Sequence, residues 1–164
     1  MNFSPSITST DRILVVDDVA DNSFLLQMLL EDEGYQVEVA DSGAAALAKI
    51  ESAPPKLVLL DVMMPGMNGY EVAQQIRENI ELPFIPIVMV TGHDQPTVSK
   101  SVQVEGFLRK PIEFDELLSQ VHAILERARK KTVERVWGLT ALTVRLCDLD
   151  NGLSETDRLT VANR

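Results

Sequence analysis

Short apolar runs recur along the chain and predict five β-strands. They stand at residues 12–17, 35–39, 56–61, 85–90 and 106–109. In the first run, RILVVD, the apolar positions are consecutive rather than alternating. That pattern is typical of a strand in a parallel sheet whose two faces are both covered. The runs therefore predict a buried parallel sheet.

Segments with helical spacing of apolar residues separate these runs. Residues 21–33 carry Phe24, Leu25, Met28 and Leu29 at such spacing, and Gly34 favours a helix stop directly after them. Further helices are expected at 42–50 with Ser42 as the cap, at 70–78, at 97–104 as a short helix, and from Phe114 onward. The alternation predicts an α/β fold with a doubly wound five-stranded parallel sheet, followed by a C-terminal helical extension.

The composition is that of a globular protein. The 164 residues are 45% hydrophobic and 24% charged, enough to build a core. A single cysteine, Cys147, excludes an internal disulfide, and no apolar run approaches the ~18 residues of a membrane helix. Residues 1–11 are polar and lack the pattern of a signal peptide. We therefore expect a cytoplasmic protein with a flexible leader at 1–11.

Charge divides the chain into two parts. Residues 1–126 hold 7 basic and 20 acidic residues, a net charge of −13, whereas residues 127–164 hold 8 and 5, a net charge of +3. An acidic body repels the phosphates of nucleic acid, so no direct nucleic-acid binding is expected. It suits a cation or a basic partner surface instead. The change of sign near Arg127 predicts a boundary, with one domain at 12–127 and a helical extension, or the start of an output region, at 128–164.

Reactive side chains stand where four of the expected strands end. The first strand ends in Asp17 and Asp18, the third in Asp61, the fourth in Thr91 and the fifth before Lys110. Ligands of open parallel sheets bind beyond the carboxyl ends of the strands. Three carboxylates there repel one another, and a divalent cation such as Mg²⁺ relieves that repulsion. With a lysine and a hydroxyl nearby, the set predicts phosphoryl chemistry in which one carboxylate is the nucleophile.

The motifs at these strand ends resemble the receiver domain of bacterial two-component response regulators. They are VVDDVADN at 15–22, LLDVMMPGMNG at 59–69, VTG at 90–92 and FLRKP at 107–111, and the resemblance covers residues 12–127. It implies a flavodoxin-like fold and a phosphorylation switch rather than an enzyme. It also implies a sensor histidine kinase or phosphotransfer protein as phosphodonor and a downstream protein partner.

The resemblance also assigns roles to individual residues. Asp61 would accept the phosphoryl group, and Mg²⁺ would be held by Asp18 directly, by Asp17 directly or through water, by Asp61, and by the backbone carbonyl of Met63. Lys110 would pair with the phosphoryl oxygens. Thr91 would move toward the phosphate, and Phe107 stands where the family has an aromatic residue that moves with it. Pro111 would follow a cis peptide bond.

Plainer interpretations stay open for several of these residues. Asp17 and Asp18 also fit a solvated pair at a strand end, and Phe107 also fits plain core packing. A phosphatase of the haloacid dehalogenase type would need an acid two residues after its nucleophile, where this chain has Met63. A receiver that never takes a phosphoryl group is disfavoured because every chemical position is filled.

The sequence departs from the receiver pattern in two places. Only 19 positions separate Thr91 from Lys110, about three fewer than receivers usually have, so we expect a short or partly unwound helix within 92–106. Beyond Phe114, a basic run at 127–135 leads to an apolar stripe at Leu139, Leu142, Leu146 and Leu149. Such a stripe needs a partner helix, which favours a homodimer or docking arm. A regulatory segment of a larger signalling enzyme, such as an HD-type phosphohydrolase, is the alternative.

Overall fold

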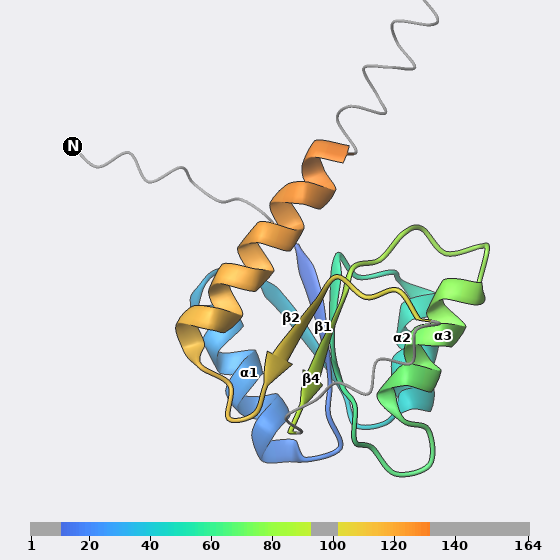
Figure 1. Cartoon of the computed structure of the whole chain (residues 1–164), viewed down its shortest axis with the longest axis horizontal. Coiled ribbons are helices and arrows are strands. Elements are labelled where there is room, and N and C mark those ends of the chain that lie inside the picture. Colours follow the sequence, from blue (N-terminus) through green and yellow to red (C-terminus); the bar gives the residue numbers. More distant parts are fainter. Residues whose placement is uncertain (1–10, 93–101, 132–164) are drawn as a thin grey trace, which may run out of the picture. The chain divides into compact units, whose positions relative to one another are not determined.

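The computed structural model describes residues 11–92 and 102–131. These residues form a five-stranded parallel sheet with the strand order β2-β1-β3-β4-β5 (Figure 1). The strands are β1 (Arg12–Val16), β2 (Gln36–Ala40), β3 (Leu57–Asp61), β4 (Ile87–Thr91) and β5 (Gly106–Arg109). The predicted doubly wound parallel sheet is confirmed, with strand bounds displaced by at most two residues.

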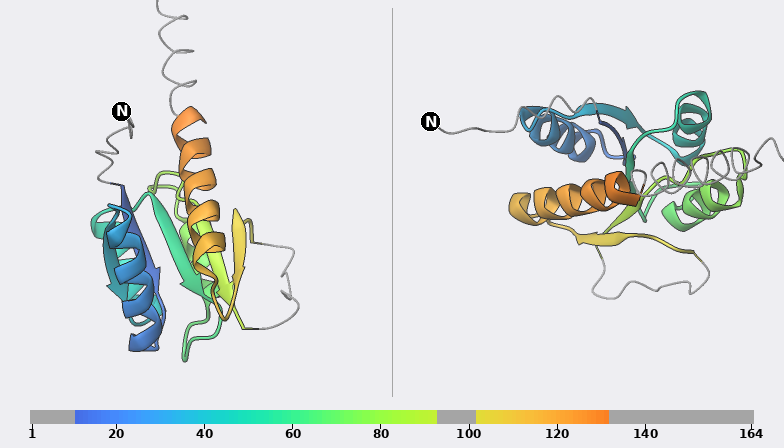
Figure 2. Two further views of the ribbon diagram at one scale, coloured as in Figure 1. Left: turned by 90° about the vertical axis from the view of Figure 1, so that its left-hand side faces the viewer. Right: turned by 90° about the horizontal axis from the view of Figure 1, so that it is seen from above.

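Helices cover both faces of the sheet (Figure 2). One apolar core packs α1 (Ala20–Asp32) and residues 114–125 of the last described helix against the sheet through Leu26, Leu30 and Leu117, among others. The second core, on the other face, is built with α2 (Gly43–Ser52) and α3 (Gly69–Glu78), which contribute Ile50 and Val72. Because both faces are covered, β1, β3 and β4 are almost entirely buried, as their unbroken apolar runs predict.

The helix ends follow local sequence signals. Ser42 caps α2 by accepting a hydrogen bond from the backbone N–H of Ala45, as predicted. Asn68 and Glu71 form a capping box at the start of α3. Gly34 follows α1 with a positive φ of 89°, which a glycine adopts without steric cost. These helix starts and ends keep the connections short and determine where the last residue of each strand lies.

Three of the four residues whose spacing predicts α1 are exposed, and only Leu29 is half-buried against the core. Ser23, Leu26 and Leu30 face the core, whereas Phe24, Leu25 and Met28 are 62%, 58% and 54% exposed. The chain offers two apolar rows on this helix, and the one with fewer large side chains packs on the sheet. An apolar surface is therefore left on α1.

Two sequence-based expectations fall wholly or partly outside the described residues. The short helix expected at 97–104 falls largely within 93–101, and the apolar stripe at 139–149 lies beyond residue 131. The chain divides into two compact units, residues 1–125 and 126–164; of the second, residues 126–131 are described and are helical. No helix among the described residues is long and apolar enough to cross a membrane.

Candidate functional site

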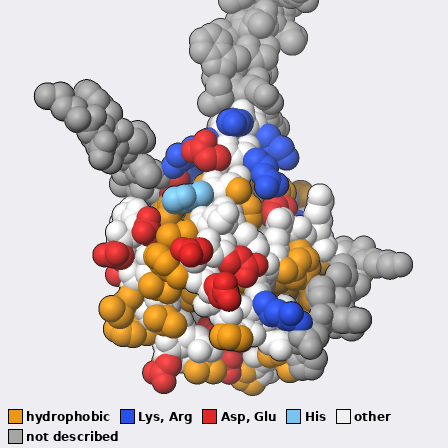
Figure 3. All heavy atoms as spheres, turned by 60° about the vertical axis from the view of Figure 1, so that its left-hand side comes forward, with side chains coloured by type: hydrophobic (Ala, Val, Ile, Leu, Met, Phe, Trp, Pro, Cys, Tyr) orange, Lys and Arg blue, Asp and Glu red, His pale blue; other side chains and the backbone are white. Residues whose placement is uncertain are grey.

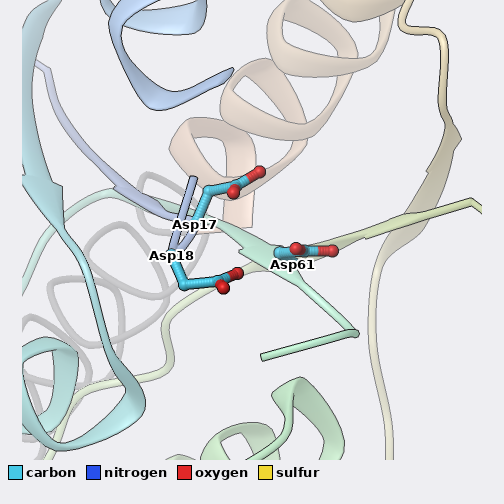
Figure 4. Close-up of side chains that lie close together, drawn as sticks. All are labelled: Asp17, Asp18 and Asp61. Atoms are coloured by element: carbon cyan, nitrogen blue, oxygen red, sulfur yellow. The ribbon is translucent and has the colours of Figure 1, made fainter. Parts of the chain in front are cut away.

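The carboxyl ends of β1 and β3 bring three carboxylates together. Asp17 and Asp18 follow directly after β1, and Asp61 is the last residue of β3 (Figure 4). One carboxylate oxygen from each lies within 4.8 Å of the other two. Asp17 and Asp61 are only 2% and 4% exposed, whereas Asp18 is exposed to solvent. The acidic cluster expected from the strand ends is thus present.

Lys110 joins two of these carboxylates. Its Nζ lies 2.9 Å from Oδ2 of Asp17 and 3.1 Å from Oδ2 of Asp61. Burial lowers the pKa of Lys110, but the two carboxylates outweigh this effect, and the net pKa is raised above its ordinary value. The ammonium group is therefore charged at neutral pH and sits between the two buried acids. The peptide bond from Lys110 to Pro111 is cis, as the resemblance implies.

Asp61 is held in an environment that disfavours its charge. Burial raises the pKa of its carboxyl group, Lys110 lowers it in part, and the nearby Asp17 raises it again. Oδ1 of Asp61 accepts a hydrogen bond of 3.3 Å from the backbone N–H of Met63. A buried carboxylate with few hydrogen-bond partners is stabilised by a bound cation or by a covalent bond formed at its oxygen. Asp61 is therefore suited to act as a nucleophile.

Asp17 is fixed more firmly than Asp61. The backbone N–H of Val19 donates to its Oδ1 at 2.8 Å, Lys110 binds its Oδ2, and the side-chain amide of Asn22 donates to Oδ2 at 3.2 Å. Asn22 is not among the residues that the sequence singles out, although it closes the motif at 15–22. Its position in the first turn of α1, five residues after Asp17, is the signal that could have identified it.

The other predicted site residues lie around this cluster. Thr91 is the buried last residue of β4, and its backbone carbonyl accepts a hydrogen bond of 2.8 Å from the N–H of Lys110. Phe107 on β5 is half-buried against the core that contains α2 and α3. Met63 exposes 65% of its surface two residues after Asp61. The sheet therefore gathers all of these positions at its carboxyl edge except Phe107, which lies within β5.

The donor set fits a small hard cation. Mg²⁺ prefers oxygen ligands at 2.0–2.1 Å in an octahedron, so two opposite ligand oxygens lie about 4.2 Å apart. Three carboxylate oxygens within 4.8 Å of one another come close to that span. The exposed Asp18 leaves the cluster open to solvent, and Mg²⁺ usually retains several water ligands. Asp17, Asp18 and Asp61 are the residues that would hold the ion.

Comparisons with known proteins agree with this arrangement. The family model of the response regulator receiver domain matches residues 13–122. Protein PilH of Pseudomonas aeruginosa is 35% identical over 117 residues, which cover 70% of this chain and 97% of PilH. The crystal structure of the chemotaxis protein CheY4 of Vibrio cholerae has a TM-score of 0.66 and 33% identity, and the match covers 71% of this chain and 99% of that protein.

A longer relative is matched only in part. A probable cyclic di-GMP phosphodiesterase of Vibrio cholerae is 37% identical over 125 residues, and the match covers 74% of this chain but only 28% of the phosphodiesterase. The chain spans about half the length of several other relatives, including the transcriptional regulatory protein ResD of Bacillus subtilis, of which it covers 50%. The similarity concerns the segment that these proteins share.

Proposed function

The chain belongs to the response regulator receiver domain family, a family of phosphoacceptor switches, and we propose that Asp61 is its phosphoacceptor. The observation that carries this proposal is the position of Lys110, whose Nζ contacts Asp61 at 3.1 Å and Asp17 at 2.9 Å. A cation between these carboxylates can stabilise the negative charge of a transferred phosphoryl group, and Asp17 accepts further bonds from Val19 and Asn22, which favours Asp61 as the nucleophile.

Each residue of the site has a separate role in phosphoryl transfer. An Asp61 carboxylate oxygen attacks the phosphorus of a phosphohistidine, an oxygen–phosphorus bond forms, and the phosphorus–nitrogen bond breaks as the imidazole nitrogen takes up a proton. Lys110 exchanges its bond with Asp61 for one with a phosphoryl oxygen. Asp17, Asp18, Asp61 and the backbone carbonyl of Met63 would hold Mg²⁺, which would supply positive charge for the phosphoryl oxygens when bound.

Thr91 and Phe107 are proposed to convert phosphorylation into a surface change. Thr91 ends the strand next to β3, one residue beyond Val90, the register partner of Asp61. Phe107 pairs with Met89 on the neighbouring strand, two residues before Thr91. A hydroxyl drawn toward the phosphoryl group leaves space that the half-buried Phe107 can fill, which shifts a population between two states.

The exposed apolar face of α1 fits a protein phosphodonor. This face is formed by Phe24, Leu25 and Met28, and Figure 3 shows hydrophobic side chains grouped beside acidic ones on that side of the molecule. Asp21 and Asp32 on the same helix are exposed. The phosphodonor that fits this face is a sensor kinase or phosphotransfer protein whose docking helix has an apolar stripe bordered by basic residues.

Phe24→Ala should slow phosphoryl transfer from that protein but leave labelling by a small phosphodonor unchanged. Equal effects on both reactions contradict this docking.

Several wider assignments belong to the same proposal. The receiver domain is assigned to residues 12–127, and the cytoplasm is the proposed location. Output through a downstream protein is proposed in place of nucleic-acid binding, and a homodimer through residues beyond 127 is proposed on the apolar stripe. The basic run at 127–135 against a body of net charge −13 supports such an association.

A second candidate function rests on the partial match to the phosphodiesterase. The shared 125 residues favour a receiver that regulates a larger signalling enzyme. A reading frame that continues past Arg164 into histidine and aspartate metal ligands supports this alternative. A stop codon at that point contradicts it.

The phosphoacceptor assignment is tested by intact mass. Wild type and the variants Asp61→Asn and Lys110→Ala are incubated with a small phosphodonor and Mg²⁺. Wild type should gain the mass of one phosphoryl group, Asp61→Asn none, and Lys110→Ala should react more slowly because it lacks the charge beside the nucleophile. A full adduct on Asp61→Asn contradicts the assignment.

A further inference from the structure

We propose that Asn22 is a positioning residue for the metal site: its side-chain amide holds the Asp17 carboxylate in the orientation that binds Mg²⁺. The inference rests on the proposed function, since it assumes that Asp17 is a ligand. It begins from the contacts of Asn22, whose Nδ2 lies 3.2 Å from Oδ2 and 3.4 Å from Oδ1 of Asp17. The amide thus spans both oxygens of one carboxylate.

The start of α1 is built around Asp17. Val19 is the N-cap of α1 and its side chain makes no capping bond, while its backbone N–H donates to Oδ1 of Asp17 at 2.8 Å. Asn22 stands in the first turn of the same helix, where its backbone N–H donates to the carbonyl of Val19 at 3.1 Å. Asparagine is a poor residue for a helix. In this first turn its side chain instead bonds the carboxylate of Asp17.

The donors around Asp17 limit how it can bind a cation. An ionised carboxylate offers about four lone-pair sites. Three donors each occupy one of these sites on Asp17: the N–H of Val19, the amide of Asn22 and the ammonium group of Lys110. About one site is left for the ion or for a water ligand of the ion. Fixing the other sites prevents the buried carboxylate from rotating away from Asp18 and Asp61.

The chemistry of asparagine suits this position. A lysine or arginine would hold Asp17 equally well but would place a further positive charge beside Lys110 and oppose binding of Mg²⁺. The neutral amide donates a hydrogen bond without adding charge. Groups that orient a metal ligand in this way typically change metal affinity 10–100-fold when they are removed.

The test compares Mg²⁺ binding with stability in two variants of the full chain. Asn22→Ala and Asn22→Leu both remove the donor, and both place a better helix former in α1. The matched control is Gln27→Ala, which removes an exposed amide on the same helix that bonds Glu31 at 2.9 Å. Affinity is measured by calorimetry with MgCl₂ and stability by thermal unfolding in a chelator.

Both Asn22 variants should bind Mg²⁺ at least about ten-fold more weakly than wild type, whereas Gln27→Ala should bind it as wild type does. An affinity equal to wild type in either folded variant overturns the proposal. A second measurement uses wild type alone. The side-chain amide protons of Asn22 should exchange with solvent more slowly than those of Gln27, and equal exchange rates also overturn the proposal. Wild type that binds no Mg²⁺ at all refutes the proposed cofactor instead, which separates the two failures.

Discussion

Gly69 lies where the backbone of α3 meets the backbone of the nucleophile. A Cβ atom at this position would lie 3.0 Å from the carbonyl carbon of Asp61 and from the Cα of Val62, and closer still to the carbonyl oxygen of Asp61. The N–H of Gly69 also donates to the carbonyl of Val62 at 3.0 Å. The atoms in the way belong to the backbone, so no side chain can rotate to make room. We therefore expect Gly69→Ala to displace the segment that carries the nucleophile.

The size of the displacement follows from these distances. Carbon atoms in contact are ordinarily about 3.5–4.0 Å apart, so the backbone near Asp61 must move by roughly 0.5–1 Å. Overpacking of this kind typically costs about 1–3 kcal/mol of stability. A displacement of about 1 Å at a reacting group can slow a reaction by about 10²-fold. Gly69→Ala should thus lose both stability and phosphorylation rate, the rate by about 10–100-fold.

Two other glycines serve as controls. A Cβ on Gly43 meets side-chain atoms of Val72 and Met67 at 2.7 and 3.0 Å, so Gly43→Ala disturbs packing without touching the backbone of Asp61. A Cβ on Gly92 has no atom within 4 Å from the rest of the described residues, its chain neighbours aside, although the residue directly follows Thr91. Urea unfolding gives the stability, and the rate of mass gain from a small phosphodonor gives the reactivity. A Gly69→Ala variant that reacts no more slowly than Gly43→Ala refutes the backbone clash as the cause.

Three further outcomes are expected. Burial raises the pKa of Asp61 in the folded protein, so folding favours the protonated carboxyl group. The resulting contribution to the free energy of unfolding is fully present below the ordinary pKa of 3.8 and is lost as pH rises through the folded-state pKa. Asp61→Asn should therefore be more stable than wild type at pH 7, with a gap that narrows toward acid in urea unfolding; a less stable variant at pH 7 contradicts this. Thr91→Ala should keep nearly normal phosphorylation but lose the change in amide hydrogen exchange that phosphorylation causes in wild type, and an equal change in both argues against the switch. Light scattering should show self-association of the full chain but not of a chain ending at Lys131, and monomers for both exclude the homodimer.

The parallel sheet and the acidic cluster could be predicted because they depend on local and repeated signals. Consecutive apolar residues in β1, β3 and β4 reflect burial on both faces, and parallel strands bring their last residues to one edge. The positions of Asp17, Asp18 and Asp61 follow from those two facts. The distances between their oxygens depend on strand twist and side-chain rotamers, which no sequence pattern specifies.

The buried face of α1 could not be read from spacing alone. Phe24, Leu25 and Met28 form one apolar row, and Leu26 and Leu30 form another. Ser23 lies on the buried face and donates to the carbonyl of Ala20, so a polar residue marks the side that packs on the sheet. The choice between two apolar rows depends on how α1 leaves the site at Asp17, which is a tertiary constraint.

Contacts between distant segments were also beyond sequence reasoning. Arg77 on α3 donates to the carbonyls of Ile85 and Gln103 and to the carboxylate of Glu105. The same carboxylate accepts the backbone N–H of Ile87 at the start of β4. This set of bonds ties α3, β4 and the approach to β5 together. The residues involved are up to 28 positions apart and carry no shared motif.

The most direct test of the central claim is to locate the phosphoryl group in the wild-type chain. After reaction with a small phosphodonor, borohydride converts a phosphorylated aspartate to homoserine, and peptide mass mapping identifies the position. With Mg²⁺ present we expect conversion at Asp61 alone, and with the metal chelated we expect little or none. Conversion at Asp17 or Asp18, or full conversion at Asp61 without metal, would contradict a Mg²⁺-dependent phosphoacceptor at Asp61.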